Sequence, residues 1–358
     1  NRLMTAFILP IRLMISFQGD EMKCLTLFLT ALLIFSTKIF AQSSSVFDTY
    51  LMVAHGCDTN GSADCSDPSN HTTHLLESSD GSSWVETGMS GLGSVPDIAS
   101  RGNYLYIYNP GNVAVIDHTS SSAPSLSSTS AVSVVDGSGN AVDYVDPSIF
   151  YDSITGKFVM FYLDATGINW DPAQCDDTDG DGVADDYPCT KEFRSATEVT
   201  GSGGTQFLQN PGFRQYITLT ASDPVAQFAS DPDIFYDGTQ YVLLISRGQN
   251  TQIFTSTYLR GKYSPVTSLN HSVLIWGHGV ASGHYDSTNN EYWIYAHDSA
   301  GVSSVRQAIV SPGSGSTIAS ISTALYITDF STVANGGTIS GTNPMYYMMA
   351  SPGILHNN

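Results

Sequence analysis

Apolar and aromatic residues alternate with polar ones along most of the chain, in short runs separated by Gly, Asp, Asn and Ser. A period of two is typical of β-strands, and turn residues between the runs indicate hairpins. The clearest runs are "VDPSIFYD" at 145–152 and "SDPDIFYDG" at 230–238. Five stretches share such a start motif and a following strand: 95–108, 145–162, 230–246, 282–297 and 343–350. No segment after residue 41 has the pattern of an ordinary helix.

These stretches behave as copies of one repeat. A second strand pair follows them, for example at 112–118 and 252–266, and the starts recur at roughly 50 residues, which indicates four-stranded propeller blades. The N-terminal segment 46–56 lacks a start motif, whereas 343–350 is a start strand with nothing after it. We therefore predict an all-β, five-bladed β-propeller whose N- and C-terminal strands close one blade and remove the open edge.

The first 41 residues have a different character. Residues 1–21 do not begin with Met and are interpreted as an upstream, non-native extension. Residues 22–41 have the features of a signal peptide, with Lys23, an apolar run at 25–35 and Ala41 at the cleavage position. The run has about half of the roughly 20 residues that span a bilayer, which favours cleavage over anchoring. We expect secretion (extracellular or periplasmic), no membrane attachment afterwards, and a monomeric single domain at 42–358.

The charge of the chain limits its possible partners, and its cysteine spacing predicts disulfides. The formal net charge is −20 with only 13 Lys and Arg, so neither nucleic acid nor an anionic membrane is an expected partner. Signal cleavage leaves two close cysteine pairs, Cys57/Cys65 and Cys175/Cys189. In an exported protein this spacing predicts two loop disulfides, whereas zinc sites commonly use Cys-x-x-Cys.

An acidic insertion, "CDDTDGDGVADDYPC", occupies residues 175–189. Alternating carboxylates around a Gly turn suit Ca²⁺, which prefers oxygen ligands. Pro188 stands where an EF-hand requires Glu, so the loop is not an EF-hand; it resembles the calcium loops of thrombospondin type 3 repeats. The sequence predicts a structural Ca²⁺ site, with a solvated acidic loop as the alternative. The expected ligands are Asp177, Asp179, Asp181, Asp185 and Asp186.

Polar residues of the start motifs should converge at one mouth of the central channel, because the innermost strands of a propeller line it. Paired carboxyl groups in a pocket are how glycosidic bonds are cut. The alternative is structural, since Asp-Pro is also favourable turn chemistry. The candidate catalytic residues are Asp97, Asp146, Asp231, Asp233 and His284.

The chain resembles the five-bladed propellers of glycoside hydrolase family 43 and of the wider arabinanase, levansucrase and invertase group. The likeness runs over about 46–350 and includes "ESSDGSSWVETG", "VPDIASRGNYLYIY" and "VDPSIFYDSITGKFVMFY". It implies that Asp146 tunes the pKa of the catalytic acid and orients substrate. It also implies a carbohydrate partner, and a histidine near the channel that His284 or His278 could match.

Two family positions differ. No Asp-Pro precedes the first strand to supply the general base, and Asn343-Pro344 could fill that place. The acid Glu of Glu-Gly-Pro aligns with Ser230, beside Asp231 and Asp233. Two hypotheses follow. One is a secreted glycoside hydrolase for plant or algal type polysaccharide or oligosaccharide, in which Asp97, Asp231 or Asp233 share the acid and base roles. The other is a non-catalytic glycan-binding or surface propeller.

Overall fold

The computed structural model describes residues 47–58, 67–91, 93–120, 126–168, 171–179, 184–298, 304–313, 317–321 and 346–356. They belong to one compact unit, Ser44–Asn358. Within these ranges the only helical elements are two short 3₁₀ turns, η1 (Pro68–Asn70) and η2 (Asn270–Ser272). No helix in the described ranges is long and apolar enough to cross a membrane. The predicted signal peptide at 22–41 and the extension at 1–21 lie outside the described residues.

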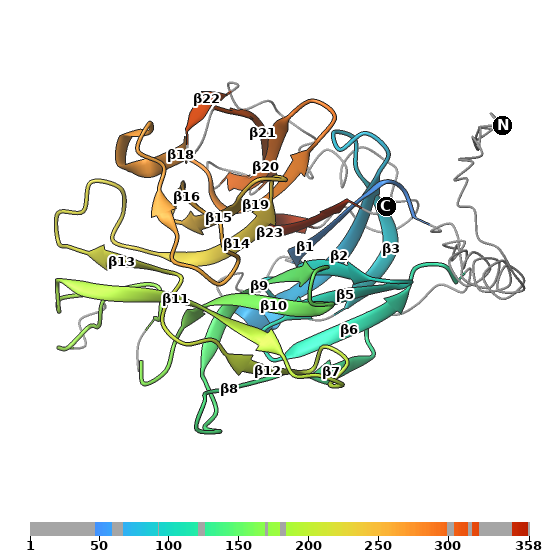
Figure 1. The fold of residues 1–358 in the computed structure, drawn as a ribbon, viewed down its shortest axis with the longest axis horizontal. Helices are drawn as coiled ribbons and strands as arrows, with labels where there is room; N and C mark the ends of the chain where they lie inside the picture. The colour runs from blue at the N-terminus through green and yellow to red at the C-terminus, as the bar shows by residue number, and fades with distance from the viewer. Residues whose placement is uncertain are drawn as a thin grey trace, which may run out of the picture. The chain divides into compact units, whose positions relative to one another are not determined.

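Five sheets form the blades of a β-propeller, as predicted (Figure 1). Blade one is β23 (Tyr346–His356), β1 (Tyr50–Asp58), β2 (His71–Ser78) and β3 (Val85–Gly91). Blade two is β4 (Asp97–Arg101), β5 (Tyr104–Asn109), β6 (Asn112–Asp117) and β7 (Thr129–Ala131). Blade five is β19 (Gly279–Asp286), β20 (Glu291–Asp298), β21 (Ser304–Pro312) and β22 (Ile318–Ile321).

Blades three and four carry additional strands. Blade three is β9 (Tyr144–Asp152), β10 (Lys157–Asp164), β11 (Cys189–Glu198) and β12 (Gln206–Gln209), with β8 (Ser133–Val135) parallel to β12 and β13 (Gln215–Leu219) on β11. Blade four is β14 (Ser230–Tyr236), β15 (Tyr241–Ser246), β16 (Asn250–Ser256) and β17 (Ser264–Pro265), with β18 (Val273–Trp276) on β16. The inner strands contact one another in the order β23, β4, β9, β14, β19 and back to β23.

The core is divided into five apolar clusters, one at each junction between neighbouring blades. Alternation along the middle strands produces this division, because successive side chains point to opposite faces of a sheet. In β15, Leu243 and Ile245 pack toward blade three, whereas Val242 and Leu244 pack toward blade five. The aromatic-rich strands of the repeat therefore serve mainly as packing surfaces between blades.

Blade one is closed by strands from the two ends of the chain, as predicted. β23 pairs antiparallel with β1, and Tyr50 lies opposite His356. One detail of the prediction is corrected: the inner strand does not end at residue 350 but continues to His356. The start motif of this blade is therefore Ser351-Pro352, and Asn343 lies outside the described residues.

The second Asp of the repeated motif is a turn residue. Asp152, Asp237 and Asp286 each accept a hydrogen bond from the backbone N–H two residues later, at 2.8–3.1 Å. This side-chain turn terminates the inner strand of three blades and begins the return strand. The recurrence of "FYD" in two blades is thus explained by hairpin geometry alone.

Candidate functional site

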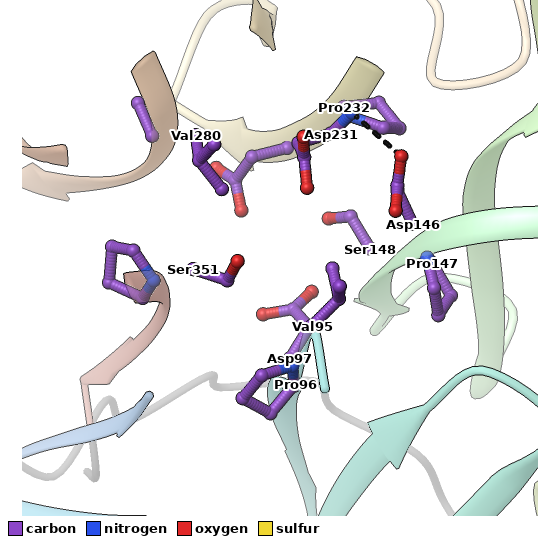
Figure 2. Close-up of a pocket in the computed structure, with 13 residues that line it drawn as sticks. Val95, Pro96, Asp97, Asp146, Pro147, Ser148, Asp231, Pro232, Val280 and Ser351 are labelled. Carbon is purple, nitrogen blue, oxygen red and sulfur yellow. Dashed lines mark hydrogen bonds between the residues drawn. The ribbon is translucent and has the colours of Figure 1, made fainter. Parts of the chain in front are cut away.

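Five residues, one from the inner-strand segment of each blade, surround the mouth of the channel (Figure 2). These mouth residues are Val95, Asp146, Asp231, Val280 and Ser351, and their φ angles are all positive, between 42° and 52°. Such backbone costs roughly 1–3 kcal/mol for a residue other than Gly, and it persists only where the surroundings impose it. The same kink in every blade brings the five side chains to one ring. The cavity at this ring, which Asp97 and Asp233 also line, is small, about 20 Å³.

Two of the mouth residues carry carboxyl groups, and they come from adjacent blades. The backbone N–H of Asp231 donates to Asp146 Oδ2 at 3.3 Å, as the dashed line in Figure 2 shows. Burial raises the pKa of Asp146 well above its usual value, and the charge of Asp231 raises it further. Burial also raises the pKa of Asp231 to about 6, although a hydrogen bond from the Ser230 hydroxyl opposes that rise. The pair therefore holds a proton more readily than ordinary carboxyls do.

Asp97 and Asp233 lie one layer deeper and join neighbouring blades. Asp97 Oδ2 accepts the N–H of Ile149 in blade three at 2.6 Å, and its Oδ1 accepts the N–H of Ile98 at 2.8 Å. Asp233 accepts the Ser282 hydroxyl at 3.0 Å and the N–H of Gly283 at 2.9 Å, both in blade five. Both oxygens of each carboxyl are thus engaged within the scaffold. These contacts join blade two to blade three and blade four to blade five.

Two serines lie in the same layer as Asp97 and Asp233, and they differ in their hydrogen bonding. Ser282 Oγ accepts the N–H of Ile354 at 3.1 Å and so joins blade five to blade one. Ser148 Oγ is buried and has no hydrogen bond of standard geometry among the described residues. It nevertheless lies close enough to Asp97 and Asp233 to lower the pKa of both.

Burial dominates the titration of the two deeper acids. It raises the pKa of Asp97 to about 6, against the opposing effect of its two backbone hydrogen bonds. It raises the pKa of Asp233 well above the usual value, and the negative charge of Asp97 adds to the rise. The two carboxyls therefore interact across the channel, and ionising both together is unfavourable.

His284, predicted at the mouth, lies instead at the other end of the inner strand. Its ring is in edge contact with Tyr50, Trp293 and His356, at centroid distances of 5.2–6.1 Å. The physical reason is the register of blade five, where Val280 aligns with Asp146 and Asp231 and His284 follows four residues later. The alternative His278 is half-buried, with Nδ1 2.6 Å from the Gly277 carbonyl.

The acidic loop is partly described. A disulfide joins Cys175 and Cys189, as predicted, whereas Cys65 of the other predicted pair lies outside the described residues. Carboxylate oxygens of Asp177, Asp179 and Asp185 lie within 4.8 Å of one another. Asp186 instead accepts the N–H of Asp176 at 2.8 Å, and Asp181 is outside the described ranges.

Three mouth residues, Val95, Val280 and Ser351, were missed by the sequence reasoning. A signal was present, because four blades share a Pro-x-Ile pattern that includes Pro352-Gly353-Ile354. The sequence reasoning looked for Asp-Pro and overlooked this pattern, because the residue before the proline differs from blade to blade. In blade one, the described residues that line the mouth are Ser351 and Pro352, so this blade contributes a hydroxyl there. Among the five mouth residues only Asp146 and Asp231 can exchange protons near neutral pH.

No protein-family model matches the chain, and no curated protein sequence matches it. Solved structures do. The GH43_1 enzyme from Xanthomonas citri complexed with xylose is 18% identical with a TM-score of 0.51, over 77% of this chain and 87% of that one. An endo-1,4-beta-xylanase from Bacteroides thetaiotaomicron is 13% identical with a TM-score of 0.43, over 80% and 98%. An alpha-L-arabinanase from Cellvibrio cellulosa complexed with arabinohexaose is 13% identical with a TM-score of 0.43, over 76% and 94%. The chain thus shares the five-bladed propeller fold of glycoside hydrolase family 43 enzymes such as the Xanthomonas protein.

Proposed function

We propose that this protein is a secreted, carbohydrate-binding propeller that does not hydrolyse glycosidic bonds by the two-carboxylate mechanism. One observation carries the second half of the proposal: the mouth has carboxyl groups on the adjacent blades three and four, and Ser351 on blade one. Cleavage of a glycosidic bond needs an acid and a base, or an acid and a nucleophile, placed on either side of it. A serine hydroxyl without an adjacent general base does not replace that carboxylate.

The size of the mouth supports the same conclusion. Its cavity of about 20 Å³ is close to the volume that one water molecule requires. Pockets that hold small molecules have volumes of roughly 300–1,000 Å³. The carbohydrate partner is supported by the fold likeness to an enzyme complexed with xylose and by exposed aromatic side chains such as Tyr236 and Trp276.

Hydrolysis remains the second candidate, because one observation favours it. The raised pKa of Asp231, about 6, is the property a general acid needs in order to stay protonated near neutral pH. In this alternative Asp231 would protonate the leaving oxygen and Asp146 would orient the substrate. The substrate class would be a neutral plant or algal type polysaccharide such as xylan, arabinan or fructan.

A direct test compares turnover and binding on those three polysaccharides. We expect retention of the wild-type protein by affinity electrophoresis on at least one of them, with no release of reducing sugar. The matched variant Asp146→Ala should then show the same absence of products. Product release that disappears in Asp146→Ala would overturn the binding-only function and establish the hydrolase.

A structural Ca²⁺ in the loop at 175–189 is a separate part of the proposal. It is supported by the convergence of Asp177, Asp179 and Asp185 and by oxygen-only donors, which suit a hard cation. Calcium should raise the melting temperature, and Asp179→Asn should reduce that increase. The exposed Asp143→Asn is the control. An equal response to calcium in both variants would reject the site.

A further inference from the structure

A second cavity of about 290 Å³ lies at the far end of the channel. Its lining comes from all five inner strands, three to five residues beyond each mouth residue. Because a strand rises about 3.3 Å per residue, this places it roughly 10–17 Å from the mouth. We call it the far-end cavity. Its polar and aromatic lining residues include Phe150, Tyr151, Tyr236, His284, Tyr285 and His356.

The lining is aromatic and carries no formal charge. Burial lowers the pKa of His284 to about 4 and also lowers that of His356, so both rings are neutral at pH 7. None of the fifteen described residues that line the cavity is Asp, Glu, Lys or Arg. An anionic ligand would leave its solvation shell here without a cationic side chain in the lining to pair with it. The protein's net charge of −20 disfavours anions further.

The polar atoms of the cavity can both donate and accept hydrogen bonds. A neutral imidazole has one N–H donor and one acceptor nitrogen. Tyr236 donates its hydroxyl to the Gly238 carbonyl at 2.8 Å, and the Tyr285 hydroxyl lies 3.0 Å from Asn290 Oδ1. Tyr285 is the donor in that contact, so each phenol oxygen keeps lone pairs for a ligand. Such groups suit a ligand with hydroxyl groups, because a hydroxyl also both donates and accepts hydrogen bonds.

One flat surface is available to a ligand. Tyr236 is 43% exposed, and its ring is held against Tyr241 at a centroid distance of 4.7 Å. A fixed aromatic ring with a polar tip presents an apolar face at little entropic cost. A sugar ring combines an apolar face of C–H groups with hydroxyls around its edge.

We infer that the far-end cavity binds a neutral sugar ring, with Tyr236 beneath the ring and the two histidines facing its hydroxyls. This rests on the proposed carbohydrate-binding function and places the binding site away from the Asp-lined mouth. A ligand of this kind fits the volume, because a single ring with its hydroxyls is smaller than the cavity.

Isothermal titration of the full protein with three neutral trisaccharides, xylotriose, arabinotriose and kestose, tests the inference. We expect one of them to bind. Tyr236→Ala should weaken its binding about 3- to 10-fold, since an aromatic contact contributes roughly 0.5–1.5 kcal/mol. Ser100→Trp, at the half-buried rim of the cavity, should fill the space and abolish binding. Tyr258→Ala, 76% exposed and outside the cavity, is the matched control and should bind as wild type does.

The possible results separate this inference from the proposed function. Unchanged binding in Tyr236→Ala and Ser100→Trp, with loss in Asp146→Asn, would place the sugar at the mouth and overturn only the inference. Absence of binding by every trisaccharide to the wild type would overturn both. Thermal melting of each variant identifies misfolding, and Tyr236→Ala decides the question if Ser100→Trp does not fold.

Discussion

The residue that follows each start proline determines how neighbouring blades are joined. Asp97 and Asp233 reach across to backbone N–H groups of the next blade, whereas the equivalent residue of blade one is Gly353. A Cβ atom at Gly353 would lie 2.5 Å from Asp97 Oδ1 and 2.8 Å from Asp97 Cα. Gly353 therefore makes room for the buried acid of blade two, and the two positions are complementary.

Gly353→Ala should lower the free energy of unfolding by about 1–3 kcal/mol, the usual cost of overpacking. The added methyl group meets backbone as well as a carboxyl oxygen, so the neighbours cannot simply rotate away. Urea unfolding measures the change. Gly137→Ala is the control, because a Cβ atom at Gly137 would have no heavy atom within 4 Å apart from its chain neighbours. An unchanged midpoint for Gly353→Ala would show that the blades relax around the methyl group.

The buried acids predict a pH dependence of stability with a definite sign. The pKa of Asp97 is about 6 in the folded protein, above its value in the unfolded chain. The folded state therefore binds the proton more tightly, and the resulting stability is fully present below pH about 4 and is lost as the pH rises through about 6. Asp97→Asn should flatten this slope. Urea midpoints at pH 4.5 and 7 test it, with exposed Asp143→Asn as the control. Identical slopes in wild type and Asp97→Asn would contradict the assignment.

At the scale of elements, β23 completes both a sheet and the ring. It supplies the inner strand of blade one, contacts β4 and β19 on either side, and contributes Ile354 to the apolar cluster with blade five. Without it, β1 would be an open edge next to an uncovered cluster, which is a template for aggregation.

Truncation after residue 345 should therefore abolish the cooperative thermal transition and produce aggregates. The loss combines the strand pairing with the burial of Ile354 and the removal of the Ser351 mouth residue. Light scattering and circular dichroism report the two effects. Truncation of Asn357 and Asn358 alone is the matched control and should melt like the full chain. A soluble, cooperatively folded truncation at 345 would mean that the ring closes without this strand.

At the scale of the molecule, local patterns predicted the architecture well because propeller blades are built from local hairpins. The short apolar runs "YVLLIS" and "KFVMFY", together with the turn residues and the repeat spacing, were sufficient to predict strands, blades and the terminal closure. The candidate site was harder. Asp146 at the mouth and Asp97, one layer deeper, both stand beside a proline, and only the side of the proline on which each stands distinguishes them in the sequence. His284 was misplaced because its blade has Ala281 where the other four have proline.

Because Tyr50 pairs with His356, the beginning of β1 lies beside the end of β23. The blades follow one another around the ring in their order along the chain, so the ring order does not depend on which blade comes first. A circular permutant that joins residues 47 and 356 through a short Gly-Ser linker and opens the chain at the exposed turn around Gly139 should fold to the same propeller. Its new ends would lie between β8 and β9 of blade three, and blade one would become a continuous, covalently linked unit. The same fold would therefore form whichever blade came first in the chain.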